Sequence, residues 1–350
     1  MKKIFMTLCA AAALVACSKT EVQYENPAEI GFAPAVMNVT KAAMGNGTLL
    51  ALNPDQKLGI WAYWNYKDGV QQDGHSEVYL DDATFAKKTV TYSSGEVTAW
   101  GGDGVAYPWP TNGTLIFAGY TKPSAEADPT VTARYNRTNR EVTFENYTPK
   151  NGYDLCWFCD NGEYNYRTSN ETIKPTLHHA LSWLTFTVKG EGTTVGWKLN
   201  KIELDGVATT GTGVCNKDGV ADWSFGTDPY VGKLPLLSSE LTLTNGAVDI
   251  ENEAKNILVL PQEINPDNQQ GTARTQHTLK ISYSYLVGSV EKTDTKVVNL
   301  DLNTANANIP NEWESGKHYT YNLTFKANEI LVSPIYGQWG DGGQQGIVIE

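Results

Sequence analysis

Two cysteines three positions apart, Cys156 and Cys159 in the run CWFC, have the spacing of a redox pair. A thioredoxin-type pair stands at a strand-to-helix turn, where the helix lowers the thiol pKa. Here the surrounding run GYDLCWFCD is apolar and aromatic, which predicts a strand, and no helical pattern follows it. We therefore expect both residues, together with Cys215, to be buried structural thiols. A redox role stays open, as does a metal role, which needs two further ligands that the sequence does not place.

Side chains three apart on a strand point to opposite faces, so a disulfide between Cys156 and Cys159 would be strained. The same geometry argues against metal binding by His178 and His179, whose adjacent side chains diverge on a strand. The other histidines, at positions 75, 277 and 318, have no cysteine or histidine at metal-ligand spacing. We expect no metal and no cofactor.

The carboxylates give no clear sign of catalysis. Asp81, Asp82 and Asp341 lack the alternating oxygen ligands of a calcium loop. No acidic residue stands out as a glycosidase carboxylate, although a pair among the 39 acidic residues is not excluded by sequence. There is no GxSxG elbow, and no pairing of a cysteine with a histidine can be argued. We therefore expect that the protein is not an enzyme.

Four tryptophans of the first half offer a different kind of chemistry, an aromatic platform for a sugar: Trp61, Trp64, Trp100 and Trp109. They stand in strand-like apolar runs, so packing in a core is the favoured interpretation for most of them. A surface lipoprotein that binds glycans through exposed Trp100 or Trp109 remains the alternative function.

The first sixteen residues have the anatomy of a signal peptide, with Lys2 and Lys3 before a short apolar core. The core ends in LVAC, the bacterial lipobox pattern, which predicts lipidation of Cys17 and anchoring in an outer membrane. An ordinary signal cleaved before an unmodified Cys17 is the alternative. The formal net charge of −12 makes nucleic acid an unfavourable partner, because phosphate binding needs a positive surface.

The elements that must position these residues are strands. Period-2 alternation marks runs such as KLGIWAYW, GTLIFAGY, HALSWLTFTV and HTLKISYSYL, and no window carries a convincing helical stripe. The sequence predicts an all-β protein with antiparallel sandwiches, and 350 residues suit two domains. The expected division is a signal peptide at 1–16, a tether and first strand at 17–41, an N-terminal domain at 42–172 and a C-terminal domain at 173–350.

Several runs together resemble the fimbrillin family of Bacteroidales, whose members build or terminate type V pili. The runs LVAC, IGFAPAV, AYPWPTNGTLIFAGYTKP, GYDLCWFC, HHALSWLTFTV, NILVLPQ and WESGKHYTYNLTF follow the family's order over nearly the whole chain. The resemblance implies two transthyretin-like β-sandwich domains in tandem. It also implies a lipoprotein precursor that becomes part of a cell-surface fimbria by strand exchange with other pilus subunits. A host or bacterial surface ligand is a further implied partner.

The resemblance assigns a role to the run EIGFAPAVMNVT, residues 29–40, which would be a temporary strand with Ile30, Phe32, Val36 and Val39 along it. An extracellular trypsin-like protease would remove it by cutting between Lys41 and Ala42. The best-known members are cut after arginine, whereas this chain has none before Arg134. Either a protease that accepts lysine acts here, or the subunit stays uncut as an anchor, or Lys41 is an ordinary loop lysine.

The end of the sequence offers a candidate donor strand. Ile347, Val348 and Ile349 form an apolar run after several glycines, which suits a movable strand that enters another subunit. An ordinary final strand of the second domain is the alternative.

Overall fold

The computed structural model describes residues 29–33, 36–37, 57–65, 76–92, 95–110, 113–123, 130–150, 152–160, 162–164, 173–227, 230–237, 239–250, 257–264, 277–300, 312–327 and 329–338. These residues form strands, turns and one short 3-10 helix, Gly192–Thr194, so the predicted all-β class is confirmed. None of the described segments is a helix with the length and apolar character that a bilayer crossing needs.

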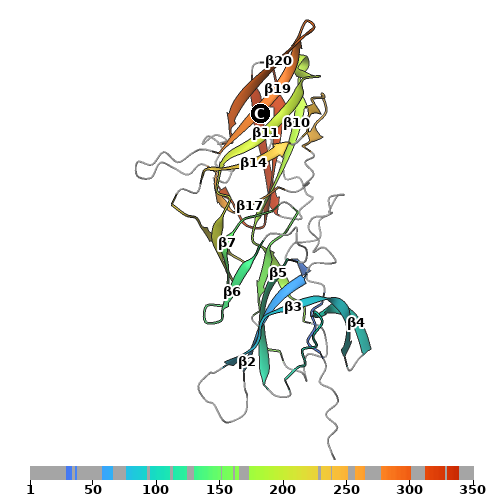
Figure 1. The fold of residues 1–350 in the computed structure, drawn as a ribbon, viewed down its shortest axis with the longest axis vertical. Coiled ribbons are helices and arrows are strands. Elements are labelled where there is room, and N and C mark those ends of the chain that lie inside the picture. The colour runs from blue at the N-terminus through green and yellow to red at the C-terminus, as the bar shows by residue number, and fades with distance from the viewer. Residues whose placement is uncertain are drawn as a thin grey trace, which may run out of the picture.

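A seven-stranded sheet forms one end of the elongated molecule (Figure 1). In sheet order its strands are β1 (Val36–Met37), β9 (Thr176–His179), β8 (Cys156–Cys159), β5 (Thr114–Lys122), β2 (Lys57–Asn65), β3 (Ser76–Tyr92) and β4 (Gly95–Gly102). All neighbours are antiparallel except β1 and β9. The central strand β5 is buried on both faces along almost its whole length, so the period-2 alternation predicted for GTLIFAGY is wrong, and the run is continuously apolar because both faces are covered.

A four-stranded sheet packs on one face of the seven-stranded sheet around a core that includes Trp61, Tyr120, Phe144, Trp157 and Cys215. Its strands, in order, are β13 (Ala221–Ser224), β12 (Gly211–Asn216), β7 (Glu141–Tyr147) and β6 (Thr132–Asn136). Both sheets therefore draw strands from either side of the expected boundary at residues 172 and 173, because β9 joins β8 and β12 joins β7. The division into two domains stays a prediction, and the sheets do not separate at that point.

The other end of the molecule is a sandwich of two five-stranded sheets (Figure 1). One holds β16 (Val248–Asp249), β10 (Ser182–Gly190), β22 (Lys317–Phe325) and β23 (Ile330–Gln338), with β17 (Ile257–Val259) beside β10. The other holds β14 (Gly232–Leu237), β11 (Lys198–Val207), β19 (Thr278–Val287) and β20 (Val290–Asn299), with β15 (Leu241–Thr242) beside β11. A short pair, β18 (Gln262–Glu263) and β21 (Glu312–Trp313), stands apart from both.

Period-2 alternation builds the core of this sandwich. Along β10, Leu184, Phe186 and Val188 point inward while the residues between them are only partly buried. Strand β22 has the same alternation and runs parallel to β10. Tyr321 of β22 stacks on Phe186, with 5.2 Å between ring centroids. The run HALSWLTFTV thus forms a strand with one apolar face, as the pattern predicts.

Candidate functional site

The segment Glu29–Ala33 lies between β4, an edge strand of the seven-stranded sheet, and Ile173, which precedes β9 on the far side of the same sheet. On one side, Phe32 exchanges two backbone hydrogen bonds with Trp100 of β4, each 2.8 Å long. On the other side, the segment accepts a bond of 3.0 Å from the N–H of Ile173 and returns one of 2.7 Å to its carbonyl. Strand β1 continues this pairing in parallel along β9. Together with β1, the segment therefore connects the edge strand β4 to the β9 side of the sheet.

The side chains of this segment fill the core that it covers. Ile30 and Phe32 are both fully buried. The Phe32 ring stands almost perpendicular to the rings of Phe85 and Phe117, with centroid distances of 5.2 and 5.4 Å, and lies 6.1 Å from the ring of Phe158. Burial of such side chains contributes about 1.5–3 kcal/mol each. Apolar contact and backbone pairing together hold the segment.

Polar side chains contribute little to the free energy that holds this segment on the sheet. Lys88 of β3 lies 2.9 Å from Glu29, and both side chains are about one-third exposed. Exposed ion pairs of this kind contribute about 0–1 kcal/mol. The backbone N–H of Ile30 donates to the carbonyl of Tyr107 at 2.7 Å. Main-chain bonds and apolar side-chain pockets are also the interactions by which proteins take up an added strand at a sheet edge.

Several residues expected to act in anchoring, processing or strand donation lie outside the described residues: Cys17, Val39, Lys41, Ala42, Ile347, Val348 and Ile349. The same holds for His75 and Asp341. Val36 is in β1, where it pairs with Thr176 of β9. The roles proposed for all of these residues stay predictions.

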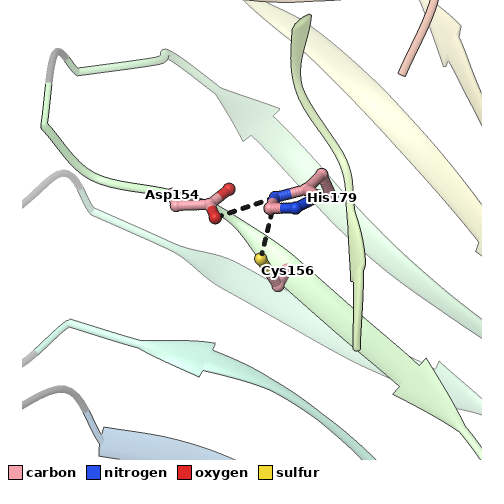
Figure 2. A group of neighbouring side chains, drawn as sticks. All are labelled: Asp154, Cys156 and His179. Carbon is pink, nitrogen blue, oxygen red and sulfur yellow. Dashed lines mark hydrogen bonds and ion pairs between the residues drawn. The ribbon is translucent and has the colours of Figure 1, made fainter. Parts of the chain in front are cut away.

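A cluster of three buried polar side chains lies in the same half of the molecule (Figure 2). Cys156 and His179 face each other across β8 and β9, and the Sγ of the cysteine lies 3.7 Å from Nδ1 of the histidine. The same Nδ1 lies 2.8 Å from Oδ2 of Asp154. Neither a pairing of a cysteine with a histidine nor a particular carboxylate could be argued from the sequence. The structure brings Cys156 and His179 together, and Asp154 beside them is only 2% exposed.

The cluster does not have the arrangement of a nucleophilic cysteine. Burial and the neighbouring Asp154 carboxylate raise the pKa of the Cys156 thiol well above its usual value, so it stays protonated. In a catalytic Cys–His–Asp set, the two ring nitrogens divide the contacts to thiol and carboxylate. Here one nitrogen of His179 faces both. The three side chains are arranged as converging ligand atoms, not as a relay toward substrate.

The two other described cysteines lie on the opposite side of the seven-stranded sheet. Cys156 belongs to the core around Phe32, whereas Cys159 and Cys215 belong to the core shared with the four-stranded sheet. All three are buried and none forms a disulfide. Burial raises the pKa of Cys159 to about 12. The predicted opposite orientation of Cys156 and Cys159 is confirmed.

The tryptophans proposed for a sugar platform are mostly core residues. Trp61, Trp100 and Trp109 are 3%, 7% and 2% exposed, and Trp64 is partly buried. Trp100 and Trp109 are thus not available for surface binding, and the alternative that relied on their exposure is wrong in this respect. The physical reason is that both pack in the apolar core around Phe32.

An open cleft of about 650 Å³ lies between the hairpin β12–β13 and the pair β18–β21. Its aromatic lining comes from Trp223, Phe225, Tyr230 and Trp313, and its carboxylates are Asp222, Glu263, Glu312 and Glu314. Aromatic faces with a few polar groups around them suit a hydroxylated ligand. The sequence analysis missed this set, since its members come from three separate segments. The only local signal is the alternating run ADWSF.

Comparison with known proteins gives a consistent result. A family profile described as fimbrillin-like matches residues 40–338. The solved structure of a fimbrial protein from Bacteroides vulgatus is similar, with 19% identity, a TM-score of 0.55 and coverage of 81% of this chain and 92% of that one. A proposed cell adhesion protein from Bacteroides uniformis has 13% identity, a TM-score of 0.51 and coverage of 90% and 100%. A search of curated proteins found no match.

Proposed function

This chain belongs to the fimbrillin-like family, and we propose that it is a non-catalytic structural or adhesive subunit of a cell-surface fimbria that assembles by strand exchange. The observation that carries the proposal is the inserted segment Glu29–Ala33, which pairs with β4 and with Ile173 ahead of β9 and buries Ile30 and Phe32. The fold shared with a fimbrial protein of Bacteroides vulgatus supports it.

The energetics of strand exchange follow from that segment. Its removal would leave backbone groups of Trp100, Tyr107 and Ile173 without their present partners, and would open an apolar trough beside Phe85 and Phe117. An open sheet edge with an apolar trough is a template for another strand. A donor strand satisfies both features through main-chain bonds and alternate side-chain pockets.

The proposed sequence of events begins with export. Cys17 carries the lipid that anchors the precursor in the outer membrane, and the inserted segment keeps the trough filled. An extracellular trypsin-like protease then cuts between Lys41 and Ala42, and the donor run Ile347–Ile349 of another subunit takes the vacated position. The finished fimbria on the cell surface contacts a host or bacterial ligand. Premature polymerisation is prevented because the trough stays occupied until the cut.

Replacement of Lys41 by glutamine is expected to block assembly. Protein from native cell surfaces should begin at Ala42 and form SDS-resistant ladders after mild trypsin, whereas Lys41→Gln should keep its lipidated Cys17 terminus and stay monomeric. Intact mass, N-terminal sequencing and gel analysis measure both. The matched control is Lys87→Gln, which removes an exposed lysine of β3.

Three results would contradict this scheme. Ladders formed by uncut Lys41→Gln protein would show that segment removal is not needed. Unchanged assembly after deletion of residues 347–349 would sink the donor assignment. A wild-type protein found only with its lipidated Cys17 terminus would make a permanent anchor the better interpretation.

A second function, glycan binding by a subunit that does not polymerise, is favoured by the cleft between β12–β13 and β18–β21. Phe225→Ala is expected to weaken binding to an immobilised glycan about tenfold, which corresponds to ~1.4 kcal/mol. The control Trp197→Ala removes an aromatic ring that stacks on Tyr283 away from the cleft. Equal binding by both variants would remove the cleft from consideration.

A further inference from the structure

Three donor atoms of different chemistry converge in the buried cluster of Figure 2. A carboxylate oxygen of Asp154, Sγ of Cys156 and Nδ1 of His179 all lie within 4.8 Å of one another. Two of the separations are 2.8 Å, from oxygen to nitrogen, and 3.7 Å, from nitrogen to sulfur. Donors held at about 2.0–2.3 Å by a tetrahedral zinc ion are roughly 3.2–3.7 Å apart. Two of the three separations are thus within a few tenths of an ångström of those in a tetrahedral zinc site, and the third, from oxygen to sulfur, is at most 4.8 Å.

The backbone holds these ligands in place before any ion arrives. Cys156 and His179 are register partners in β8 and β9. Thr121 of β5 links the third ligand residue, Asp154, to Cys156. Its hydroxyl accepts a hydrogen bond from the N–H of Cys156 and donates one to the carbonyl of Asp154, both at 2.9 Å. Ligands carried on paired strands and fixed by such bonds are preorganised. Thr121 is a positioning residue for this cluster.

The charges of the cluster favour a divalent cation. A buried carboxylate is costly unless it is paired or binds a metal. One dication with the Asp154 carboxylate, a Cys156 thiolate and a neutral His179 imidazole has no net charge. Binding replaces the thiol proton with a metal–sulfur bond, and that proton leaves to solvent.

The donor set selects among metals. Calcium and magnesium prefer oxygen ligands, whereas a thiolate, an imidazole and a carboxylate together suit zinc. Three protein ligands leave one tetrahedral position for a water molecule. We propose that Asp154, Cys156 and His179 bind a Zn²⁺ ion that links β8 to β9. This inference does not depend on the proposed assembly function, because it concerns only the folded subunit.

The test is zinc binding by the full chain after its metals have been removed with a chelator. Equilibrium dialysis should find zinc bound with an affinity that Cys156→Ser and His179→Gln each lower at least tenfold, or ~1.4 kcal/mol. The control Cys159→Ser, which changes a buried thiol on the other face of the same strand, should bind like the wild type. Substitution with Co²⁺ should produce a thiolate-to-metal charge-transfer band that is absent in Cys156→Ser.

Two results would overturn the proposed zinc site. A wild-type chain without zinc and without the cobalt band would overturn the site, whatever the variants do. Binding by folded Cys156→Ser with the affinity of the wild type would also overturn it, since the ion would then not depend on this thiol. Near-ultraviolet circular dichroism checks each fold, and Asp154→Asn serves as a further ligand variant if the cysteine variant does not fold.

Discussion

Replacement of Phe32 by alanine is expected to lower the free energy of unfolding by about 3–5 kcal/mol. The ring is fully buried and packs against Phe85, Phe117 and Phe158, so its loss removes apolar contacts and leaves a cavity. Urea unfolding, followed by circular dichroism, measures the change. A loss this large from a single residue near the N-terminus would show that the inserted segment is an integral part of the folded sheet.

The matched control is Val78→Ala in β3 of the same sheet. Val78 is 56% exposed, so this truncation is expected to change stability by no more than about 0.5 kcal/mol. If Phe32→Ala costs under about 1 kcal/mol, the segment contributes little to the folded state, and its proposed function as a filler of the trough loses its energetic basis.

Acid is expected to destabilise the protein through His277. This side chain is fully buried, and burial lowers its pKa to about 4. Its Nε2–H donates to Oε1 of Gln262 at 3.1 Å, and its ring meets Trp313 edge-on at 4.9 Å. Because a histidine in the unfolded chain has a pKa of about 6.5, the unfolded state binds more protons between these values. Stability is therefore fully present above pH 6.5 and falls as the pH is lowered, by about 3 kcal/mol at pH 4.

His277→Gln tests this because glutamine keeps a donor for Gln262 and does not titrate. Urea unfolding of both proteins from pH 7.5 to pH 4 gives two curves in which all carboxylates titrate alike, so their difference isolates the histidine. The wild-type curve should fall more steeply below pH 6.5. Parallel curves would show that His277 is protonated as easily in the folded protein as in the unfolded chain.

The strands could be predicted from local pattern. The runs KLGIWAYW, HALSWLTFTV and HTLKISYSYL alternate every second residue, and the structure has β2, β10 and β19 over them. Alternation reports that one face of a strand is buried. It does not report which strand lies beside it, and this limit explains where the structure differs from the predictions.

Local alternation does not predict which distant strands pair. The hairpin β12–β13 pairs with β7, more than sixty residues earlier, although its own residues follow the expected boundary. Alternation shows equally well on either side of a domain boundary. Trp100 and Trp109 were ambiguous for a similar reason, since a strand-like apolar run does not say whether its rings face a core or solvent.

The Asp154–Cys156–His179 cluster illustrates the same limit at a site. Asp154 and Cys156 are two positions apart, so a strand places them on one face, and that much is in the sequence. His179 joins them only because β8 and β9 pair in a register that opposes it to Cys156. The adjacent His178 would have taken its place after a shift of one residue.

The inserted segment also bears on how the chain folds. Phe32 pairs with Trp100 and with Ile173, so one partner lies more than a hundred positions away along the chain. Contacts between such distant positions require closure of a long loop, and proteins rich in them fold slowly. The segment is synthesised first but completes its pairing only after Ile173 has been made. Pairing of this segment is therefore expected to be a late event in folding. Until it occurs, β4 and β9 remain exposed on the sides that the N-terminal residues later cover.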